Sequence, residues 1–321
     1  MIDRELFLNL NFEELVSPQS IGTAADANIL DWGQFLRERA RLKAEGRSGQ
    51  STNGLTVVRG RFNLIANFVL SEIVLTHPSE RAMVINKFIR LAWKAYLLKN
   101  FNALVAIIAG LQSEWVSKAK RQAFNKVGTW ENRVLADLIA WTSNEADFKH
   151  IRQTVEALVD AKPIIGGTQD SSIGGGDGQP LTARSRAASE GRPPSPPSCV
   201  PFFGVYLAQL HYSNLPDLID PTAPHEPVGV DPESNTFESL AHPEVFSTLA
   251  PLPSPMQLEP LINVHKQRLI AGIIKSLVAG QHLASKVQFP LDKKIYQKCL
   301  KLRGLDTDTL ERALALYSDR K

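Results

Sequence analysis

The sequence has only two cysteines, Cys199 and Cys299, among 321 residues. Two thiols cannot form a disulfide framework or supply the ligands of a four-cysteine zinc site. No run of 18 apolar residues occurs, so the sequence predicts no membrane span. The first residues, MIDRELFLNLNFEELV, are acidic and amphipathic, unlike a secretory signal. We therefore expect an intracellular, soluble chain in the cytoplasm that holds no metal.

A large charge of one sign is also missing. Lys and Arg number 36, Asp and Glu number 33, and the formal net charge is +3. A dedicated nucleic-acid-binding domain normally carries a strongly basic face, so this balance argues against a nucleic-acid partner. One basic group is typical of a solvated helix end, with a partner-facing patch as the alternative; its members are Lys118, Lys120, Arg121 and Lys126.

Motifs for covalent or metal chemistry are absent too. The sequence contains no G-x-S-x-G, H-E-x-x-H or C-x-x-C pattern. The glycine run at 174–176 has no following Gly-Lys-Ser/Thr, so we interpret it as a linker rather than a phosphate loop. The seven histidines are dispersed, and Cys199 precedes an apolar helix start, as a buried structural thiol would. We expect no metal site and no cofactor.

Proline and glycine are concentrated in two stretches. Residues 166–198 contain 7 Gly, 6 Ser and 5 Pro and no aromatic residue, so this stretch is predicted to be a disordered insertion. Residues 216–256 are rich in proline but also contain apolar side chains such as Phe237 and Leu240. We expect them to form an ordered, irregular excursion on the surface.

Elsewhere the apolar residues recur with helical spacing. The run 103–111 is apolar on nearly all sides, which predicts a central, buried helix. Alternating runs at 55–58 and 228–230 are too short to count as strands. The sequence therefore predicts an all-α fold of about ten helices around one core. Besides helices around Val58 to Ile73 and Val84 to Leu97, the expected ranges are 29–45, 129–142, 145–160, 202–213, 257–284, 291–302 and 306–318.

Four segments, in this order, carry a family resemblance: 57–64 (VVRGRFNL), 81–111 (beginning RAMVINKFI and ending NFNALVAIIAGL), 199–207 (CVPFFGVYL) and 261–271 (LINVHKQRLIA). Together they resemble the catalytic domain of Ras-family guanine-nucleotide exchange factors. The resemblance implies one catalytic domain over 1–286, an all-helical bowl with a protruding helical hairpin, and a Ras-like small GTPase as partner. Residues 287–321 would be a helical extension packed on the same domain. The second insertion resembles fungal members of the family.

The resemblance also implies a mechanism without covalent chemistry. The partner binds guanine nucleotide through its phosphate loop and Mg²⁺, and its switch loops are ordered by those contacts. In the family, the hairpin displaces the first switch and disturbs the Mg²⁺ and phosphate site, while the bowl holds the second switch. Exchange is then promoted because the nucleotide-free GTPase is bound better than the loaded one.

Positions that match the family's partner-binding surface lie in three segments. The first hairpin helix corresponds to 202–214 and the returning helix to about 257–283. Simple core packing is the alternative for Phe202 and Tyr206, and a salt bridge within the domain is the alternative for Arg59. The predicted partner-binding residues are Val58, Arg59, Asn63, Val105, Ala109, Gln112, Phe202 and Tyr206.

The hairpin departs from the family pattern. Relatives commonly carry a carboxylate followed by Gly-Asn-Pro, and here Leu215 falls on the carboxylate position. Asp217 and Asp220 are the nearest acids and could substitute in a shifted register. His211 falls on the position that faces the Mg²⁺ site, so steric displacement by His211, Tyr212 and Leu215 is the mechanism that we expect. The alternative is a GTPase-binding scaffold with a degenerate hairpin.

Two further expectations concern the whole protein. The helical exchanger motif that usually supports the hairpin is absent from this chain, and the abrupt start at Met1 suggests a fragment of a longer protein. We expect the fragment to be a monomer without direct membrane insertion, recruited to a membrane by regions outside it. A helical enzyme or nucleic-acid-binding module unrelated to GTPases is the remaining alternative, and it would need a clustered site that the sequence does not show.

Overall fold

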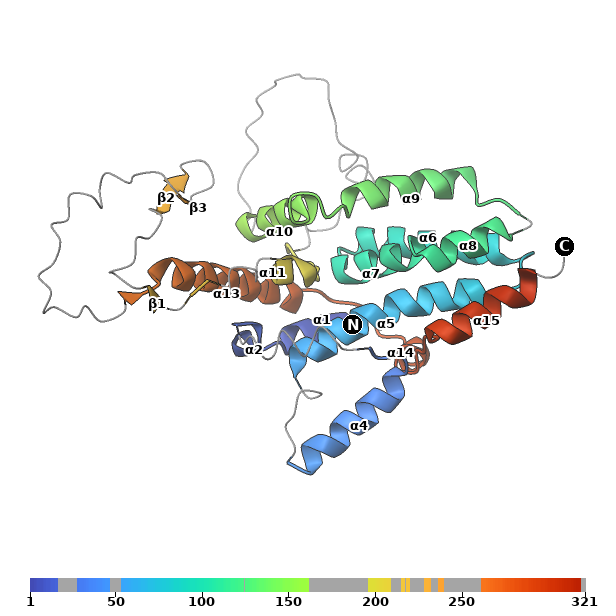
Figure 1. The fold of residues 1–321 in the computed structure, drawn as a ribbon, viewed down its shortest axis with the longest axis horizontal. Coiled ribbons are helices and arrows are strands. Elements are labelled where there is room, and N and C mark those ends of the chain that lie inside the picture. The colour runs from blue at the N-terminus through green and yellow to red at the C-terminus, as the bar shows by residue number, and fades with distance from the viewer. Residues whose placement is uncertain are drawn as a thin grey trace, which may run out of the picture.

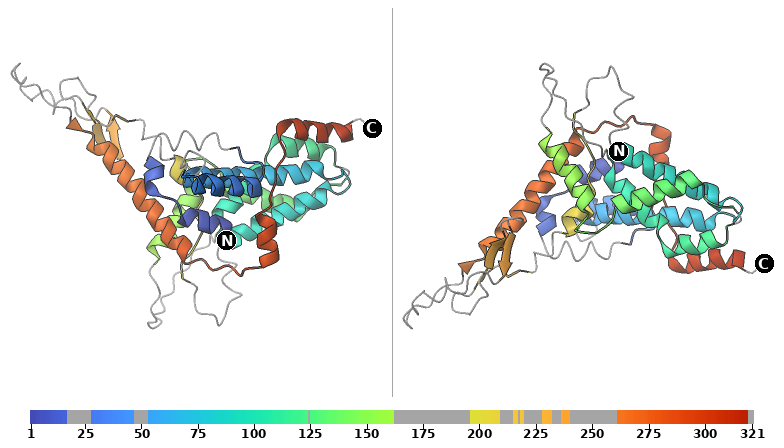
Figure 2. Two further views of the ribbon diagram at one scale, coloured as in Figure 1. Left: turned by 90° about the horizontal axis from the view of Figure 1, so that it is seen from below. Right: turned by 90° about the horizontal axis from the view of Figure 1, so that it is seen from above.

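The computed structural model is a helical body from which one long helix extends (Figures 1 and 2). Three helices form its central layer. The first of them is preceded by Asn53, whose side chain accepts a hydrogen bond from the Leu55 amide at 2.8 Å, as an N-cap does. The three are α5 (Gly54–Leu75), α6 (Arg81–Leu97) and α7 (Phe101–Leu111). The structure describes residues 1–16, 28–46, 53–123, 125–161, 196–208, 215–216, 218–219, 228–231, 236–239 and 261–318.

Helix α7 is the centre of the core. It begins after Asn100, whose side chain accepts a hydrogen bond from the Ala103 amide at 3.1 Å. Its side chains are buried on nearly every side, as the apolar run 103–111 predicts. Gly110 lets α7 lie close to α5, because a Cβ atom there would come within 2.6 Å of the Ala66 carbonyl oxygen.

Further helices cover this layer: α8 (Glu114–Arg121), α9 (Thr129–Trp141), α10 (Lys149–Asp160) and α15 (Thr307–Ser318). Helix α9 packs on α6, while α15 packs on α5 and α8. Arg81 is fully buried and donates hydrogen bonds to the carbonyl oxygens of Val74, Thr76 and Ala119. These acceptors satisfy a charge that would otherwise be costly to bury, and they tie α6 to the ends of α5 and α8.

The N-terminal helices support the root of the long projecting helix. α1 (Ile2–Leu8) and α2 (Phe12–Val16) pack against α13 (Val264–Ser285). Gln281 Nε2 donates to the carbonyl oxygens of Phe7 at 3.1 Å, Leu8 at 3.5 Å and Leu10 at 3.0 Å. A hydrophobic cluster joins α1, α5, α11 (Gly204–Ala208) and α13; its members include Phe7, Leu55, Val58, Phe203, Tyr206, Ile273 and Leu277.

Helices α4 (Trp32–Ala44) and α14 (Lys293–Cys299) lie on the side of α5 that is remote from α9 and α10 (Figure 1). Trp32, at the base of α4, is 1% exposed. The Trp32 amide donates to the Leu302 carbonyl oxygen at 3.1 Å, and Arg303 Nε lies 2.7 Å from Asp31 Oδ2. These contacts fasten the chain after α14 to the base of α4.

Four short strands accompany the projecting helix. β1 (Leu218–Ile219) pairs antiparallel with β4 (Leu261–Ile262), and β2 (Val228–Asp231) pairs antiparallel with β3 (Thr236–Ser239). Figure 2 shows these strands beyond the body, beside the outer part of α13. The remaining described elements are helices, so the predicted all-α class is confirmed.

Two details of the expected secondary structure were wrong. The run 228–230 was dismissed as a strand but lies in β2, because a partner strand a few residues later completes its backbone hydrogen bonds. The helix expected from 257 begins only at Val264, since Asn263 caps it and 261–262 pair with β1 instead. Most of the two predicted insertions lies outside the described residues. The hairpin residues His211, Tyr212, Asp217 and Asp220 lie outside them as well.

Candidate functional site

An open pocket lies between α7 and the connection from α9 to α10. Its volume is about 290 Å³. Three of the sequence-predicted partner-binding residues line it together, and two of them, Ala109 and Gln112, are exposed. Val105 is 8% exposed and forms part of the apolar floor. The complete lining is Val105, Ile108, Ala109, Gln112, Thr142, Asn144 and Phe148.

The connection that forms the far wall has an unusual backbone. Ala146, Asp147 and Phe148 have φ angles of 46°, 54° and 60°, all in the left-handed region. This region costs a residue with a Cβ roughly 1–2 kcal/mol. The Nη2 group of Arg152 donates to the Ala146 carbonyl oxygen at 3.0 Å and so helps to hold the turn. The turn brings Phe148 back over the start of α10, where it faces the pocket.

An aromatic row continues from the pocket into the core. The rings of Phe148 and Phe202 meet edge to face with centroids 4.9 Å apart, and the ring centroids of Phe62 and Phe202 are 5.5 Å apart. Aromatic pairs at these distances contribute about 0.5–1.5 kcal/mol beyond their buried area. Phe202 is only 7% exposed, so it supports the pocket from below through Phe148.

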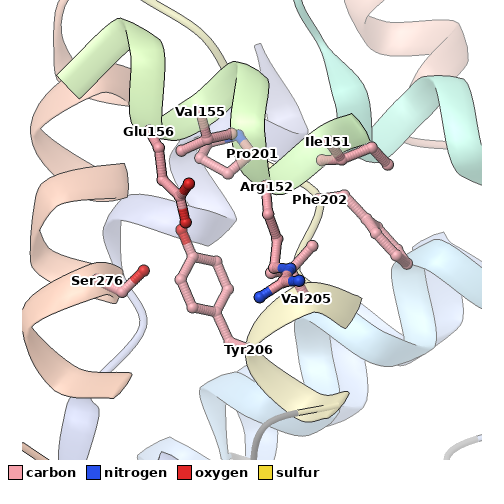
Figure 3. Close-up of a pocket in the computed structure, with 9 residues that line it drawn as sticks. All are labelled: Ile151, Arg152, Val155, Glu156, Pro201, Phe202, Val205, Tyr206 and Ser276. Carbon is pink, nitrogen blue, oxygen red and sulfur yellow. The ribbon is translucent and has the colours of Figure 1, made fainter. Parts of the chain in front are cut away.

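A second, smaller cavity lies next to Phe202, between α10, α11 and α13 (Figure 3). Its volume is about 30 Å³, which is room for about one or two water molecules and for no larger ligand. In Figure 3 the Glu156 carboxylate and the Tyr206 hydroxyl point toward one another. Tyr206 is 2% exposed, and burial raises its pKa well above the ordinary value. The cavity is lined by Ile151, Arg152, Val155, Glu156, Pro201, Phe202, Val205, Tyr206 and Ser276.

The α5 residues predicted to bind a partner have different surroundings. Val58 is 4% exposed and belongs to the cluster with Phe7 and Tyr206, so it can act only from beneath the surface. Asn63 is exposed. Arg59 is half-buried and forms no ion pair or hydrogen bond with any other residue that the structure describes. The α-helical spacing puts Arg59 and Asn63 on the side of α5 that carries Phe62.

At the start of the projecting helix, the chain around Leu215 is tied to α13. Lys266 Nζ donates to the Leu215 carbonyl oxygen at 2.6 Å, and Asn263 Nδ2 donates to the Pro216 carbonyl oxygen at 2.9 Å. The Asn263 side-chain oxygen also accepts from the Lys266 amide. Lys266 is 8% exposed, so a largely buried ammonium group is held at the backbone of Leu215.

Sequence reasoning missed Phe148, Lys266 and Asn263 as site residues. Asn263, before the apolar run of α13, is an N-cap signal, but its second bond, to Pro216, joins segments 47 positions apart.

Cys199 is buried, as predicted, and burial raises the pKa of its thiol to about 12. Among the residues that the structure describes, no three His, Cys, Asp or Glu side chains gather as metal ligands would. In the same part of the chain, no helix is both long and apolar enough to span a bilayer.

The described residues form a helical body that has an open, partly apolar pocket and one long projecting helix. The comparison with known families identifies this fold. The family model of the RasGEF domain matches residues 1–268, and the chain belongs to this family. The resemblance found in the four sequence segments is thereby confirmed.

Several characterised relatives are similar to this chain. The guanine nucleotide exchange factor LTE1 of Kluyveromyces lactis is 22% identical over 317 residues, which is 97% of this chain and 17% of that protein. The Ras guanine nucleotide exchange factor M of Dictyostelium discoideum is 33% identical over 95 residues, 29% of this chain and 10% of its own length. The LTE1 proteins of Saccharomyces cerevisiae and Candida glabrata also match, which supports the predicted likeness to fungal members. The chain spans 17% or less of the length of the relatives from Kluyveromyces and Dictyostelium.

Proposed function

We propose that this chain binds a Ras-like small GTPase and promotes the release of its GDP. Family membership and the names of the relatives support this function. The single observation that carries it is the open pocket in which Ala109, Gln112 and Phe148 meet, because a nucleotide-exchange factor must hold its partner by such a surface. A GTPase with nanomolar affinity for nucleotide needs about 12 kcal/mol to release it. The factor lowers the barrier by binding the empty GTPase better, without covalent chemistry.

In this proposal the pocket receives the second switch of the GTPase. Val105 and Phe148 provide the apolar contact, and Gln112 provides a polar group at the rim. Arg59 and Asn63 extend the surface along α5, where Arg59 has no competing acceptor among the described residues. An arginine that loses water on binding needs an acidic or carbonyl acceptor, so we expect such a group on the GTPase. Phe202, Tyr206 and Val58 support this surface from the core.

The hairpin acts on the other switch in the same proposal. Steric displacement by His211, Tyr212 and Leu215 would open the nucleotide site, and the bonds from Lys266 and Asn263 would hold Leu215 and Pro216 in place.

A second function is favoured by one observation. The Lys266 ammonium group is bonded to the backbone of Leu215, the residue expected at the family's carboxylate position. If neither Asp217 nor Asp220 replaces that carboxylate, the hairpin lacks the charge that competes for the phosphate loop. The alternative is a GTPase-binding scaffold that does not accelerate release.

The test is the release of a fluorescent GDP analogue from Ras, Rap and Ral proteins, with and without this chain. Faster release from at least one of them is the expected result. A stable complex with unchanged release would establish the scaffold instead. If no GTPase in the panel is bound, in the loaded or the empty state, the proposed function is wrong.

Two variants separate the pocket from the hairpin. Ala109→Trp fills the pocket from an exposed position and should abolish both binding and exchange, whereas Ala40→Trp, at an exposed position on α4, should change neither. Lys266→Met removes the tie to Leu215 and should slow release about tenfold while the complex still forms. Equal activity of Ala109→Trp and the unmodified chain would show that the GTPase binds elsewhere.

Cytoplasmic location and a monomeric state remain predictions, to be checked by fractionation and light scattering.

A further inference from the structure

Positive charge is concentrated in one short segment that the proposed exchange function does not use. Residues 286–303 contain six basic side chains and one acidic side chain, a formal charge of +5, whereas the whole chain has +3. The rest of the chain is therefore slightly negative. The basic residues of the segment are Lys286, Lys293, Lys294, Lys298, Lys301 and Arg303, and the acidic residue is Asp292.

The structure arranges these charges on one exposed side of α14 and the turn after it. Lys294, Lys298 and Lys301 follow one another at i, i+4 and i+7, which places them on the same side, and all three are exposed. Two aliphatic side chains accompany them: Ile295 is 60% exposed and Leu291 is 51% exposed. The opposite side of the segment packs against the body, where Leu300 and Leu302 contact a buried cluster formed by Ile29, Trp32, Val57 and Leu64.

Most of this charge has no ion-pair partner among the described residues. Arg303 pairs with Asp31 at 2.7 Å. The Asp292 carboxylate accepts hydrogen bonds from the Lys294 and Ile295 amides, so it caps the helix. Lys293, Lys294, Lys298 and Lys301 form no ion pair with any described residue. Four ammonium groups therefore remain available to an external anion.

We propose that this surface is a peripheral contact site for an anionic lipid bilayer. Lysines attract an anionic membrane surface electrostatically, with about a fivefold gain in partitioning for each one. Exposed aliphatic side chains such as Leu291 and Ile295 can enter the boundary between headgroups and acyl chains. The contact uses a helix of 7 residues, which is too short to cross a bilayer, so it lies on the membrane surface.

The residue types favour lipid over an acidic protein or a nucleic acid. Protein interfaces are enriched in arginine and aromatic residues and depleted of lysine, the reverse of the composition found on α14. Binding of single-stranded nucleic acid relies on exposed aromatic rings, whereas Tyr296, the aromatic residue of α14, is half-buried. No residue of this surface lines the pocket between α7 and α10, so a membrane on α14 leaves that pocket uncovered.

The test is sedimentation of the whole chain with phosphatidylcholine vesicles, with and without phosphatidylserine. We expect binding to the anionic vesicles only, and weaker binding as salt is added. Replacing Lys294, Lys298 and Lys301 by glutamine should lower partitioning about 100-fold, and Ile295→Ser should lower it several-fold. The matched control removes the same charge elsewhere, by glutamine at Lys118, Lys120 and Arg121, and should bind nearly as the unmodified chain does.

Three outcomes would overturn the proposal. The first is failure of the unmodified chain to sediment with anionic vesicles. The second is an equal loss of vesicle partitioning in the α14 and control variants. That result would mean that binding depends only on the net charge of the chain. The third is that the chain binds polyglutamate through the lysines of α14 but binds no vesicles. That result would identify an acidic protein surface as the ligand. No GTPase enters this assay, so its result is independent of the proposed exchange activity. Circular dichroism of each variant checks that the fold is unchanged.

Discussion

The two sides of helix α5 use the same residue type in opposite ways. Arg61 is 4% exposed, its guanidinium lies 4.9 Å from the centre of the Trp32 ring, and Nη1 donates to the Cys299 carbonyl oxygen at 3.1 Å. Arg59, two positions earlier, is half-buried and has no ion pair among the described residues. We call the Arg61 side, covered by the base of α4 and residues 299–305, the closed side of α5. The open side carries Arg59, Phe62 and Asn63.

The difference lies in what the rest of the chain places over each side. The closed side is covered by the base of α4 and by a segment 238 positions away, as the contacts of Arg61 with Trp32 and with the Cys299 carbonyl oxygen illustrate. Burial there lowers the pKa of Arg61, because water no longer stabilises the charged form. On the open side Phe62 packs on Phe202, but no described residue forms an ion pair or hydrogen bond with Arg59, and Asn63 is exposed. An arginine in a helix is therefore structural or available to a partner according to distant segments, which its own sequence neighbourhood does not reveal.

The largest expected effect concerns the closed side. Arg61→Ala should lower the free energy of unfolding by about 3 kcal/mol, because it leaves a cavity beside Trp32 and removes a hydrogen bond. Arg61→Met fills the space without a charge, and Arg61 Nε has no hydrogen-bond partner to lose. Replacing a buried charge by an apolar side chain is often nearly neutral, so this variant should stay within about 1 kcal/mol of the original. Urea denaturation measures both, and equal losses would mean that the charge itself is required.

The next effect concerns Arg59, on the open side. Arg59→Ala should weaken the GTPase complex at least about tenfold, since charged hydrogen bonds at an interface contribute about 1.5–3 kcal/mol. Its unfolding free energy should change by less than about 0.5 kcal/mol, as expected for a residue outside the packed core. Surface plasmon resonance gives the affinity, with Arg37→Ala on α4 as the control. Unchanged affinity would mean that the GTPase does not contact the open side of α5.

A matched aromatic pair sharpens the comparison. Phe148→Leu, on the pocket side, should lower GTPase affinity about fivefold, because the edge-to-face contact with Phe202 no longer fixes the side chain. Phe35→Leu, on the closed side, loses a stacked contact with Trp32 at 5.4 Å. This second change should lower stability by about 1 kcal/mol and leave affinity unchanged. Titration with the GTPase and thermal melting measure both quantities for both variants. A loss of affinity in Phe35→Leu, or unchanged affinity in Phe148→Leu, would contradict the prediction.

The smallest expected effect is at the left-handed turn. Ala146 is exposed, so Ala146→Gly removes no packing and relieves a φ of 46°. The relief of roughly 1–2 kcal/mol is offset in part by the greater freedom of glycine in the unfolded chain, which costs about 0.4–1 kcal/mol. The variant should be more stable by about 0.5 kcal/mol, measured as a small rise in melting temperature. A lower melting temperature would mean that the turn is not left-handed in solution.

Much of the helical arrangement could be predicted from the sequence because apolar periodicity reports which side of a helix is buried. The grouping of Val105, Ala109 and Gln112 followed from their spacing on α7 and is found in the pocket lining. Periodicity does not report what covers a helix, and so it could not show that Val58 would be enclosed by Phe7 and Tyr206.

Other features depend on backbone conformations or pairings without a local signal. Phe148 reaches the pocket through three left-handed residues, none of them glycine, and sequence propensity gives no warning of such a turn. Lys266 meets the Leu215 carbonyl across 51 positions. The assignment of partner-binding roles came from the family resemblance, and those roles await the binding measurements described above.

The three carbonyl oxygens that Gln281 engages, on Phe7, Leu8 and Leu10, have a consequence for the direction of α13. They belong to backbone more than 270 positions earlier in the chain, and Arg4 adds a bond to the Ala284 carbonyl oxygen at 3.0 Å. The opening residues of the sequence therefore help to fix the angle at which the long helix leaves the body. A change of a fraction of an ångström at this pivot is multiplied along the helix, so substitutions near Phe7 should alter nucleotide release without touching the GTPase.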